Sequence, residues 1–239
     1  MAASSGLPTG HRRAHRHGRL DVGDYYTAPL AEVDEANAHL FIPDIRACAS
    51  CDLHRWHIEN ALACPGWFPQ FGIDILFVGM SPGEEEDKKG RPFVGRAGQK
   101  LMSLANRVKL FEPMDGLPVT FGLTNIVRCH TPSNRPPTGL ETEACRRWLD
   151  VELDMADPIV VILLGNSAIE FAFPGKKIGE VAGDARAVAT AGSSTRIYIA
   201  SYHPAAILHR PDENVERSIL KSFSLARELL MRRSNALRS

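Results

Sequence analysis

The stretch IDILFVGMSPGEEEDKKGRPFVGRAGQK, residues 73–100, decides the fold. Its first part, Ile73 to Gly79, is an apolar run of the kind that forms a buried parallel strand. A loop rich in glycine and proline follows, and Gly98 to Val108 then carries apolar residues at helical spacing. Strand, loop and helix in this order predict the first unit of an α/β protein.

Strands and helices alternate along the rest of the chain. Apolar runs predict strands at residues 119–127, 159–164 and 196–200, and helical patterns predict helices at 140–155, 167–173 and 212–233. Residues 34–51 read as a helical lead-in, and residues 175–194 as irregular or hairpin-like. We therefore expect an α/β three-layer sandwich around a central four-stranded parallel sheet. Such sheets bind ligands at the carboxyl ends of their strands, which places the loops at 79–95, 125–129 and 201–210 at one edge.

Length and charge narrow the class of protein. A chain of 239 residues, 44% of them hydrophobic, can bury one core, so we predict one domain at residues 34–239. Residues 1–33 read as a disordered basic arm, because their composition buries little apolar surface. A formal net charge of zero leaves any nucleic-acid binding to local clusters of Lys and Arg. With no apolar run near about 20 residues and no secretory signal, we expect a cytoplasmic monomer without membrane contact or organelle targeting.

The predicted loops carry three side chains suited to a flat polar ligand. The turn GMSPG brings backbone N–H groups of Gly79, Met80 and Gly83 close to a ligand, although such turns are also plain chain reversals. Phe93 is either a stacking platform or a core residue. Asn125 offers a donor and an acceptor side by side, which suits a pyrimidine edge, or it satisfies local backbone. His203 is either structural or a donor to a developing oxyanion.

Four of the five cysteines have a spacing typical of a metal site. Cys48 and Cys51 form a C-x-x-C pair, and fifteen residues separate Cys129 from Cys145. Four thiolates suit either zinc or an iron–sulfur cluster, whereas the alternative is a set of buried, unlinked thiols. Cys64 stands outside the pattern.

Together these motifs resemble family 4 of the uracil-DNA glycosylase superfamily, the bacterial and archaeal iron–sulfur branch. The first family motif is similar to GEAPGEEEDxxGxPFVGxAG, and residues 79–98 repeat it with two changes. NIVRC at 125–129 resembles N-x-V-x-C, and HPAAILHR at 203–210 resembles HPxxLLR. The resemblance implies hydrolysis of the N-glycosidic bond of deoxyuridine in single- or double-stranded DNA, as in base excision repair. A catalytically weak protein that binds uracil-containing or single-stranded DNA is the alternative.

The resemblance also implies roles for individual residues. Cys48, Cys51, Cys129 and Cys145 would hold a structural 4Fe-4S cluster. Phe93 would stack on the flipped uracil, Asn125 would read its N3–H and O4, and His203 would donate to its O2. After the last strand, the loop from Pro204 to Arg210 would press into the duplex, with Ile207 or Leu208 filling the vacated base stack and Arg210 on a phosphate. Asn166 and Ser167, at a helix N-terminus, would make a second phosphate contact.

The departures from the family lie where its members position the water that attacks the sugar. Typical members carry Glu and Ala where this chain has Met80 and Ser81. Single-strand-selective monofunctional glycosylases resemble GMNPG here and hold the water with the third residue, so we predict that Ser81 aligns the water, with slower catalysis than a carboxylate supports. The acids at 84–87 would either compensate or serve as loop scaffold. The chain lacks the basic insertion of the branch that captures the abasic sugar covalently, so we do not expect capture, although His130 lies nearby.

Overall fold

The structure, a computed structural model, describes residues 42–56, 63–69, 71–190 and 195–236. The predicted arm at 1–33 and the first part of the predicted lead-in helix lie outside these ranges. Within them, none of the helices combines the length and the apolarity that a membrane crossing requires.

The sheet contains the four parallel strands that the sequence predicts. Its order is β2 (Phe121–Asn125), β1 (Ile75–Gly79), β3 (Val160–Leu164), β5 (Thr195–Ser201) and β4 (Ala185–Ala189). The first four are parallel to their neighbours, and β4 pairs antiparallel with β5 as an exposed edge strand. This fifth strand forms one arm of the hairpin that was one of two expectations for residues 175–194. Its sequence, ARAVA, lacks the apolar run that marks the central strands.

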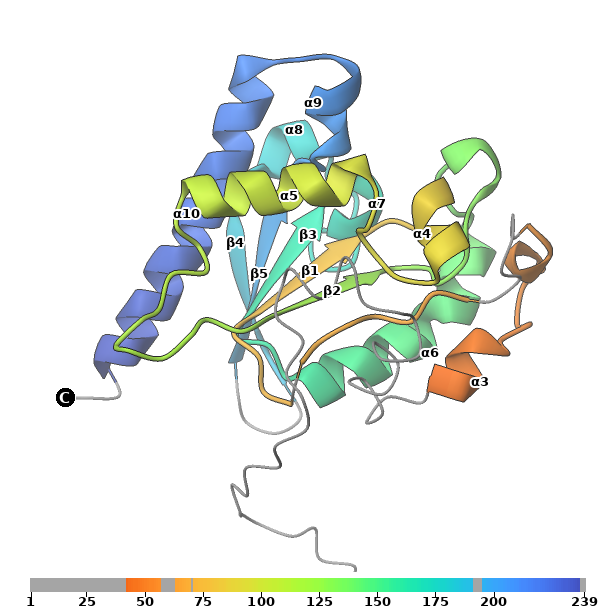
Figure 1. The fold of residues 1–239 in the computed structure, drawn as a ribbon, viewed down its shortest axis with the longest axis horizontal. Helices are drawn as coiled ribbons and strands as arrows, with labels where there is room; N and C mark the ends of the chain where they lie inside the picture. The colour runs from red at the N-terminus through yellow and green to blue at the C-terminus, as the bar shows by residue number, and fades with distance from the viewer. Residues whose placement is uncertain (1–41, 57–62, 70, 191–194, 237–239) are drawn as a thin grey trace, which may run out of the picture.

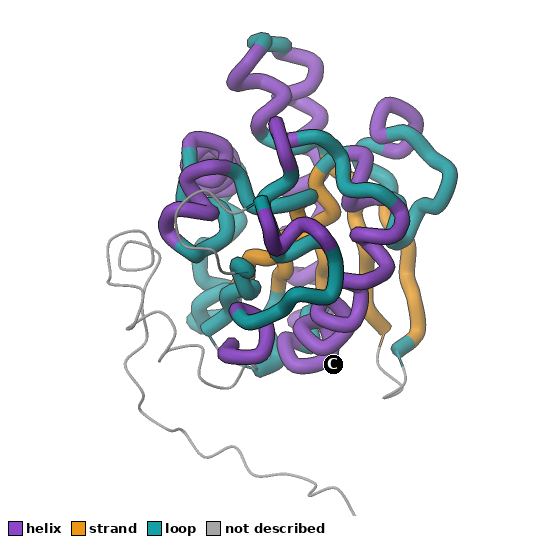
Figure 2. Tube along the Cα trace, turned by 90° about the vertical axis from the view of Figure 1, so that its right-hand side faces the viewer, coloured by secondary structure: helices purple, strands orange, loops and turns teal. Residues whose placement is uncertain are grey.

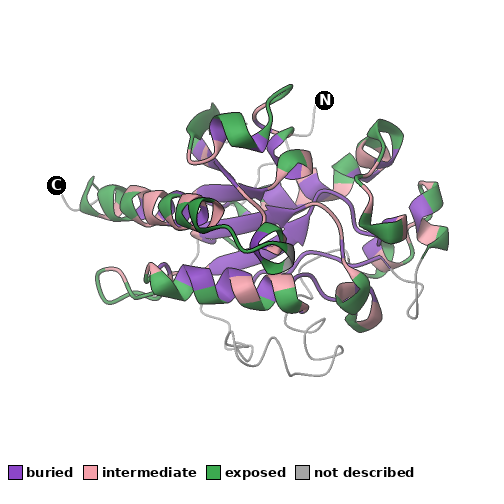
Figure 3. Cartoon of the chain, turned by 90° about the horizontal axis from the view of Figure 1, so that it is seen from above, coloured by how far each residue is buried: buried purple, intermediate pink, exposed green. Residues whose placement is uncertain are grey.

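Helices cover both faces of the sheet, as Figure 1 and Figure 3 show. One face carries α5 (Arg96–Arg107), α9 (Ala205–His209) and α10 (Glu213–Ala236), and the other carries α3 (Ile42–Arg46), α6 (Gly139–Ala156), α7 (Asn166–Ile169) and α8 (Ile178–Val181). Alternation along β1 sends Phe77 into the first layer and Val78 into the second. The tube view shows helices and loops flanking the central strands, with one strand at the outer edge of the molecule (Figure 2). The predicted three-layer sandwich is confirmed.

Capping residues set the bounds of α6, the longest helix on its face. Thr138 accepts a hydrogen bond from the backbone N–H of Glu141, and the Glu141 carboxylate accepts one from the Thr138 N–H. Asp157 ends the helix in the left-handed conformation (φ 36°), directly before Pro158. The predicted helix at 140–155 is therefore confirmed to within a residue at each end.

Two short helices lie within stretches predicted as loops, α4 (Glu84–Lys89) and α9. Two more segments, η1 (Asp52–Arg55) and η2 (Pro132–Asn134), lie where no helix or strand was predicted. The α4 segment forms because Glu86 caps its first turn and Lys88 pairs with Glu84 at 2.9 Å one turn away. In contrast, α7 is only four residues long and ends at Ile169, before the predicted end at Phe173. Short helices have too few periodic positions to be recognised by pattern.

Candidate functional site

The first two predicted loops meet at a point of very close approach. Gly79 ends β1, and Asn125 ends the neighbouring strand β2 in register with it. A Cβ atom on Gly79 would lie 2.5 Å from Asn125 Oδ1 and 2.8 Å from Phe93 Cζ. Only glycine fits this position. The structure thus brings Gly79, Phe93 and Asn125 together at the carboxyl edge of the sheet, and all three are buried.

Phe93 adopts an unusual backbone conformation that Gly98 makes possible. Its φ of 58° lies in the left-handed region, which non-glycine residues seldom occupy. A Cβ atom on Gly98 would lie 1.7 Å from the Phe93 carbonyl oxygen, so the first turn of α5 must be bare here. The Phe93 ring is nearly parallel to the His203 imidazole, with centroids 6.1 Å apart and an interplanar angle of 23°. Such backbone strain is typical of ligand-binding sites.

His203 is held as a neutral imidazole with a defined tautomer. Its Nδ1 accepts a hydrogen bond from the backbone N–H of Ala205 at 3.1 Å, so the ring proton resides on Nε2. Burial lowers the pKa of His203 to about 4, and the ring therefore stays neutral near pH 7. The backbone of Gly165, at the end of β3, packs against it, since a Cβ atom there would lie 3.3 Å from His203 Cβ. The arrangement leaves Nε2–H as a hydrogen-bond donor.

Ser81 contacts a residue that sequence reasoning missed. The Ser81 hydroxyl lies 3.3 Å from that of Thr131, and Thr131 is fully buried. The first two motifs are also tied through backbone, because Ile126 N–H donates to Gly79 O (2.9 Å) and Val127 N–H to Met80 O (3.1 Å). Thr131 follows the Cys129 motif by two residues, and only its burial beside the turn sets it apart from other threonines.

His130 supports the turn. It is buried, and its Nδ1 lies 3.1 Å from the Pro82 carbonyl oxygen. Because a carbonyl oxygen only accepts, Nδ1 carries a proton. One ring nitrogen is therefore engaged in holding the GMSPG turn in place.

The acids that follow the turn are arranged as scaffold. Glu86 accepts hydrogen bonds from the backbone N–H groups of Gly83 (3.2 Å) and Gly95 (2.7 Å), so its carboxylate closes the loop that presents Phe93. Glu84 is exposed and pairs with Lys88, whose hydrogen bond and charge lower the Glu84 pKa. This geometry favours the scaffold interpretation over a catalytic carboxylate that replaces the missing family Glu.

The expected DNA-facing residues divide into exposed and buried side chains. Leu208 is 39% exposed and Arg210 is exposed, whereas Ile207 is only 7% exposed and packs in the core beneath α5 and α10. Of the two alternatives for filling the base stack, helical periodicity in α9 turns Ile207 inward and leaves Leu208 at the surface, so the geometry favours Leu208. Pro204 is also buried.

The helix N-terminus at α7 is partly committed to local structure. Asn166 Oδ1 accepts a hydrogen bond from the backbone N–H of Ile178 at 2.8 Å, so it caps α8. Ser167, the next residue, is half-buried. Sequence position alone does not reveal this cap, because the two helices are separated by a loop.

The four predicted cysteine ligands line one cavity. Cys48 and Cys51 precede η1, Cys129 follows β2 and Cys145 lies on α6, and all four border the same space together with Ser50, His54 and Arg128. All are free thiols. Cys64 is buried elsewhere, where burial raises its pKa, and does not line the cavity. The separation of Cys64 from the other four matches the expectation from spacing.

Hydrogen-bond donors face the sulfur atoms. Arg128 N–H lies 3.3 Å from Cys145 Sγ, and Trp148 Nε1 lies 3.3 Å from Cys48 Sγ. Burial raises the pKa of Cys48, but hydrogen bonds with Ser50, Trp148 and Arg147 outweigh it and lower the value to about 7. Burial also raises the pKa of Cys129, and the neighbouring thiolates add to the rise. Such donors are the usual surroundings of sulfur ligands.

The thiols are spread around the cavity. Across the described ranges, no three His, Cys, Asp or Glu side chains gather closely enough to share one metal ion. In a 4Fe-4S cluster each cysteine binds a different iron, so the four sulfurs surround a volume and need not converge on a point. The residues present therefore fit a cluster as the group that would occupy the cavity.

The fold and site define the class: an α/β protein whose candidate binding residues meet at the carboxyl ends of parallel strands, beside a cavity lined by cysteine thiols. The sequence profile of the Uracil DNA glycosylase superfamily matches residues 65–226. Because this match covers more than half of the chain, the chain belongs to the uracil DNA glycosylase superfamily.

Individual relatives show the same kinship. The chain is 34% identical over 178 residues to the Type-4 uracil-DNA glycosylase of Archaeoglobus fulgidus. The matched residues make up 71% of this chain and 82% of that protein. It is 31% identical over 186 residues to the Type-4 uracil-DNA glycosylase of Thermotoga maritima, with 78% and 91% covered. A Type-5 uracil-DNA glycosylase of Thermus thermophilus is 34% identical over a shorter 152 residues, 54% of this chain.

Proposed function

We propose that this protein is a uracil-DNA glycosylase that hydrolyses the N-glycosidic bond of deoxyuridine in DNA. The observation that carries the proposal is the convergence of Phe93, Asn125 and a neutral His203 at one edge of the sheet. A flat ring, an amide edge and a fixed N–H donor are the three groups that recognition of a uracil ring requires. The Type-4 relatives support the same substrate.

Base recognition relies on Asn125. Its buried carboxamide presents one acceptor to N3–H and one donor to O4 of uracil. Cytosine reverses this order, so a fixed carboxamide would leave buried polar groups unpaired against it. Phe93 stacks on the ring and supplies affinity without discrimination.

Bond cleavage relies on His203 and an aligned water. The C1′–N1 bond breaks, and its electron pair leaves on uracil, whose O2 receives the Nε2–H hydrogen bond as negative charge develops. A water oxygen bonds to C1′, its proton passes to solvent, and uracil leaves as the anion. Ser81, held by Thr131, orients that water. A neutral hydroxyl is a weak base, so the expected rate is below that of a relative with a carboxylate.

Two further groups complete the proposal. The four cysteines would hold a 4Fe-4S cluster, whose chemistry here is a structural crosslink between the segment before η1, the loop after β2 and helix α6. Leu208 would enter the vacated base stack, and Arg210 would contact a phosphate; both side chains are exposed. Gly79, Met80 and Gly83 would place backbone close to the base.

The test is uracil release from a single-stranded oligonucleotide by protein purified without oxygen. Mass spectrometry of the mixture distinguishes free uracil, a covalent adduct and unchanged DNA. We expect free uracil, no release from the matched cytosine oligonucleotide, and about four irons per chain. Intact uracil DNA after overnight incubation of cluster-loaded protein would sink the proposal, and stoichiometric zinc in a colourless protein would overturn the cluster.

A weak uracil-DNA binding protein is the second candidate, favoured by the hydroxyl of Ser81 where a carboxylate is typical. The pair Ser81→Ala and Ser81→Glu separates the two. An enzyme that uses Ser81 loses rate in the first variant and changes rate in the second. Unchanged rates in both would refute the water assignment, and binding without release by every variant would favour the second candidate.

A further inference from the structure

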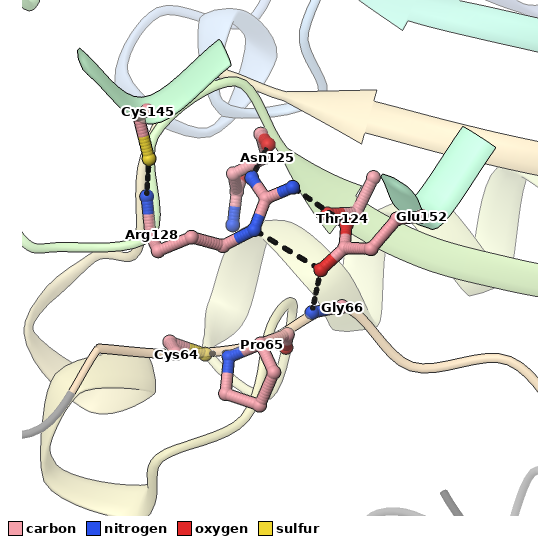
Figure 4. A network of polar contacts seen from close by, with 8 residues as sticks. All are labelled: Cys64, Pro65, Gly66, Thr124, Asn125, Arg128, Cys145 and Glu152. Atoms are coloured by element: carbon pink, nitrogen blue, oxygen red, sulfur yellow. Dashed lines mark hydrogen bonds and ion pairs between the residues drawn. The ribbon is translucent and has the colours of Figure 1, made fainter. Parts of the chain in front are cut away.

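A fully buried ion pair lies between the base pocket and the cysteine cavity. Arg128, in the NIVRC segment, and Glu152, on α6, have side chains that are 1% and 0% exposed. Arg128 Nε and Nη2 donate to the two Glu152 carboxylate oxygens at 3.1 and 2.6 Å. Figure 4 shows the guanidinium between Glu152 and the Asn125 backbone. Charges buried this completely persist only where every polar atom has a partner.

One end of the pair contacts the last two residues of β2, Thr124 and Asn125. Arg128 Nη1 donates to the backbone carbonyl oxygen of Asn125 itself. Glu152 Oε2 accepts from the hydroxyl of Thr124, the preceding residue, at 2.5 Å. The last peptide of β2 is therefore fixed by the ion pair as well as by the sheet, which ends at this residue.

The other end of the pair reaches the cysteine cavity. The backbone N–H of Arg128 donates to Cys145 Sγ at 3.3 Å, and Arg128 lines the cavity next to Cys129. Cys145 and Glu152 are seven residues apart on α6, about two turns, and so share a helix face. Glu152 also accepts from the backbone N–H of Gly66 at 2.8 Å, which adds a third segment to the network.

We propose that Arg128 and Glu152 are positioning residues for uracil recognition, and that they tie the geometry of Asn125 to the cysteine cavity. The inference rests on the proposed function, because it takes Asn125 as the residue that reads the base. The physical reason is geometric. The position of the Asn125 carboxamide depends on the orientation of the Asn125 peptide group, whose carbonyl oxygen accepts a hydrogen bond from the guanidinium. Release of the peptide group lets the carboxamide move, and a misplacement of about 1 Å in a binding group costs roughly 100-fold in rate.

The experiment separates positioning from stability. Arg128→Met strands the Glu152 carboxylate and should lower both Tm and activity. Adding Glu152→Gln removes the stranded charge and keeps an acceptor for Gly66. We expect the double variant to regain much of the lost Tm and its iron content, while kcat/KM on uracil DNA stays roughly 100-fold below wild type. Recovery of kcat/KM together with Tm would show a purely structural pair and overturn the proposal.

Arg128→Lys keeps the charge and serves where Arg128→Met does not fold. An ammonium group cannot reproduce the planar fork that reaches Asn125 O and both carboxylate oxygens at once. We expect iron content and affinity for abasic-site DNA within about twofold of wild type, but inhibition by free uracil at least tenfold weaker. Wild-type kcat/KM and uracil inhibition in this variant would contradict the proposal.

The Arg135–Glu141 pair provides the matched control. It is also a two-point Arg–Glu contact, made by Arg135 with Glu141 of α6 at 2.8 and 2.6 Å, and Asn125 takes no part in it. Arg135→Met with Glu141→Gln should alter Tm with kcat/KM within about threefold of wild type. A wild-type protein that releases no uracil would refute the proposed function instead, and direct binding of free uracil to wild type and Arg128→Lys still reports on the pair in that case.

Discussion

Substituting alanine for Gly79 tests the pocket most directly. The added Cβ would lie 2.5 Å from Asn125 Oδ1 and 2.8 Å from Phe93 Cζ, whereas ordinary van der Waals contact begins at 3.4 Å. The Asn125 oxygen therefore has to move by about 0.9 Å, or the strand end has to shift by a similar amount. A shift of about 1 Å in a recognition group costs roughly 100-fold in kcat/KM, or about 2.7 kcal/mol of transition-state stabilisation. Overpacking should also cost about 1–3 kcal/mol of folding free energy.

The assay is steady-state uracil release from a single-stranded oligonucleotide, with Tm and iron content measured on the same samples. Gly139→Ala is the matched control, because a Cβ atom at Gly139 meets nothing within 4 Å and its backbone is helical. We expect the control to keep wild-type activity and Tm or to gain slightly in Tm. Gly79→Ala should lose about 2–4 °C for each kcal/mol while keeping its iron.

The refuting result is a Gly79→Ala protein whose kcat/KM lies within threefold of wild type. Such a protein would show that Asn125 and Phe93 do not contact the base at this point. Loss of activity in step with loss of iron would instead indicate unfolding around the cysteine cavity, so the iron measurement decides between the two explanations.

Three further predictions concern the surroundings of the pocket. Because the pKa of His203 is lowered to about 4, kcat/KM should fall on the acid side near pH 4 and not near pH 6.5. The unfolded histidine binds its proton at a higher pH than the folded one, so up to roughly 3 kcal/mol of folding free energy is lost as pH falls from 6.5 to 4. Urea titrations should find this pH dependence of stability absent in His203→Gln. Thr131→Val should slow uracil release several-fold and add little to Ser81→Ala, and additive losses in a double-mutant cycle would contradict the contact. Glu86→Gln turns an amide donor toward one of two backbone N–H groups and should cost about 1–3 kcal/mol in thermal melts, whereas exposed Glu84→Gln should change stability by less than about 0.5 kcal/mol.

Two of the neighbouring acids, Glu84 and Glu86, are committed to other contacts and do not replace the missing family carboxylate. Both carboxylate oxygens of Glu86 accept hydrogen bonds from backbone N–H groups, and Glu84 forms an ion pair with Lys88 at the surface. In the proposed function, Ser81, in contact with Thr131, is the group that would orient the water. A slow enzyme with an intact uracil pocket is the consequence we expect.

Local sequence was sufficient for the parts of this protein that repeat or follow in order. Apolar runs and helical spacing predicted the four parallel strands and the long helices, because strand and helix periodicity depends only on neighbouring residues. The ligand edge followed from topology, since the carboxyl ends of parallel strands share one side of the sheet. Cysteine spacing pointed to a shared site for four thiols, and the four line one cavity in the structure.

Tertiary structure alone decided which side chains contact each other. The Arg128–Glu152 pair joins residues 24 apart, and Thr131 meets Ser81 across 50 positions, so no local pattern announces either contact. The packing of α9 buries Ile207 and leaves Leu208 exposed, and a hydrogen bond from a backbone N–H determines the tautomer of His203. The physical reason is that periodicity fixes the direction of a side chain relative to its own element, whereas its partners, its burial and its pKa depend on how all the elements pack.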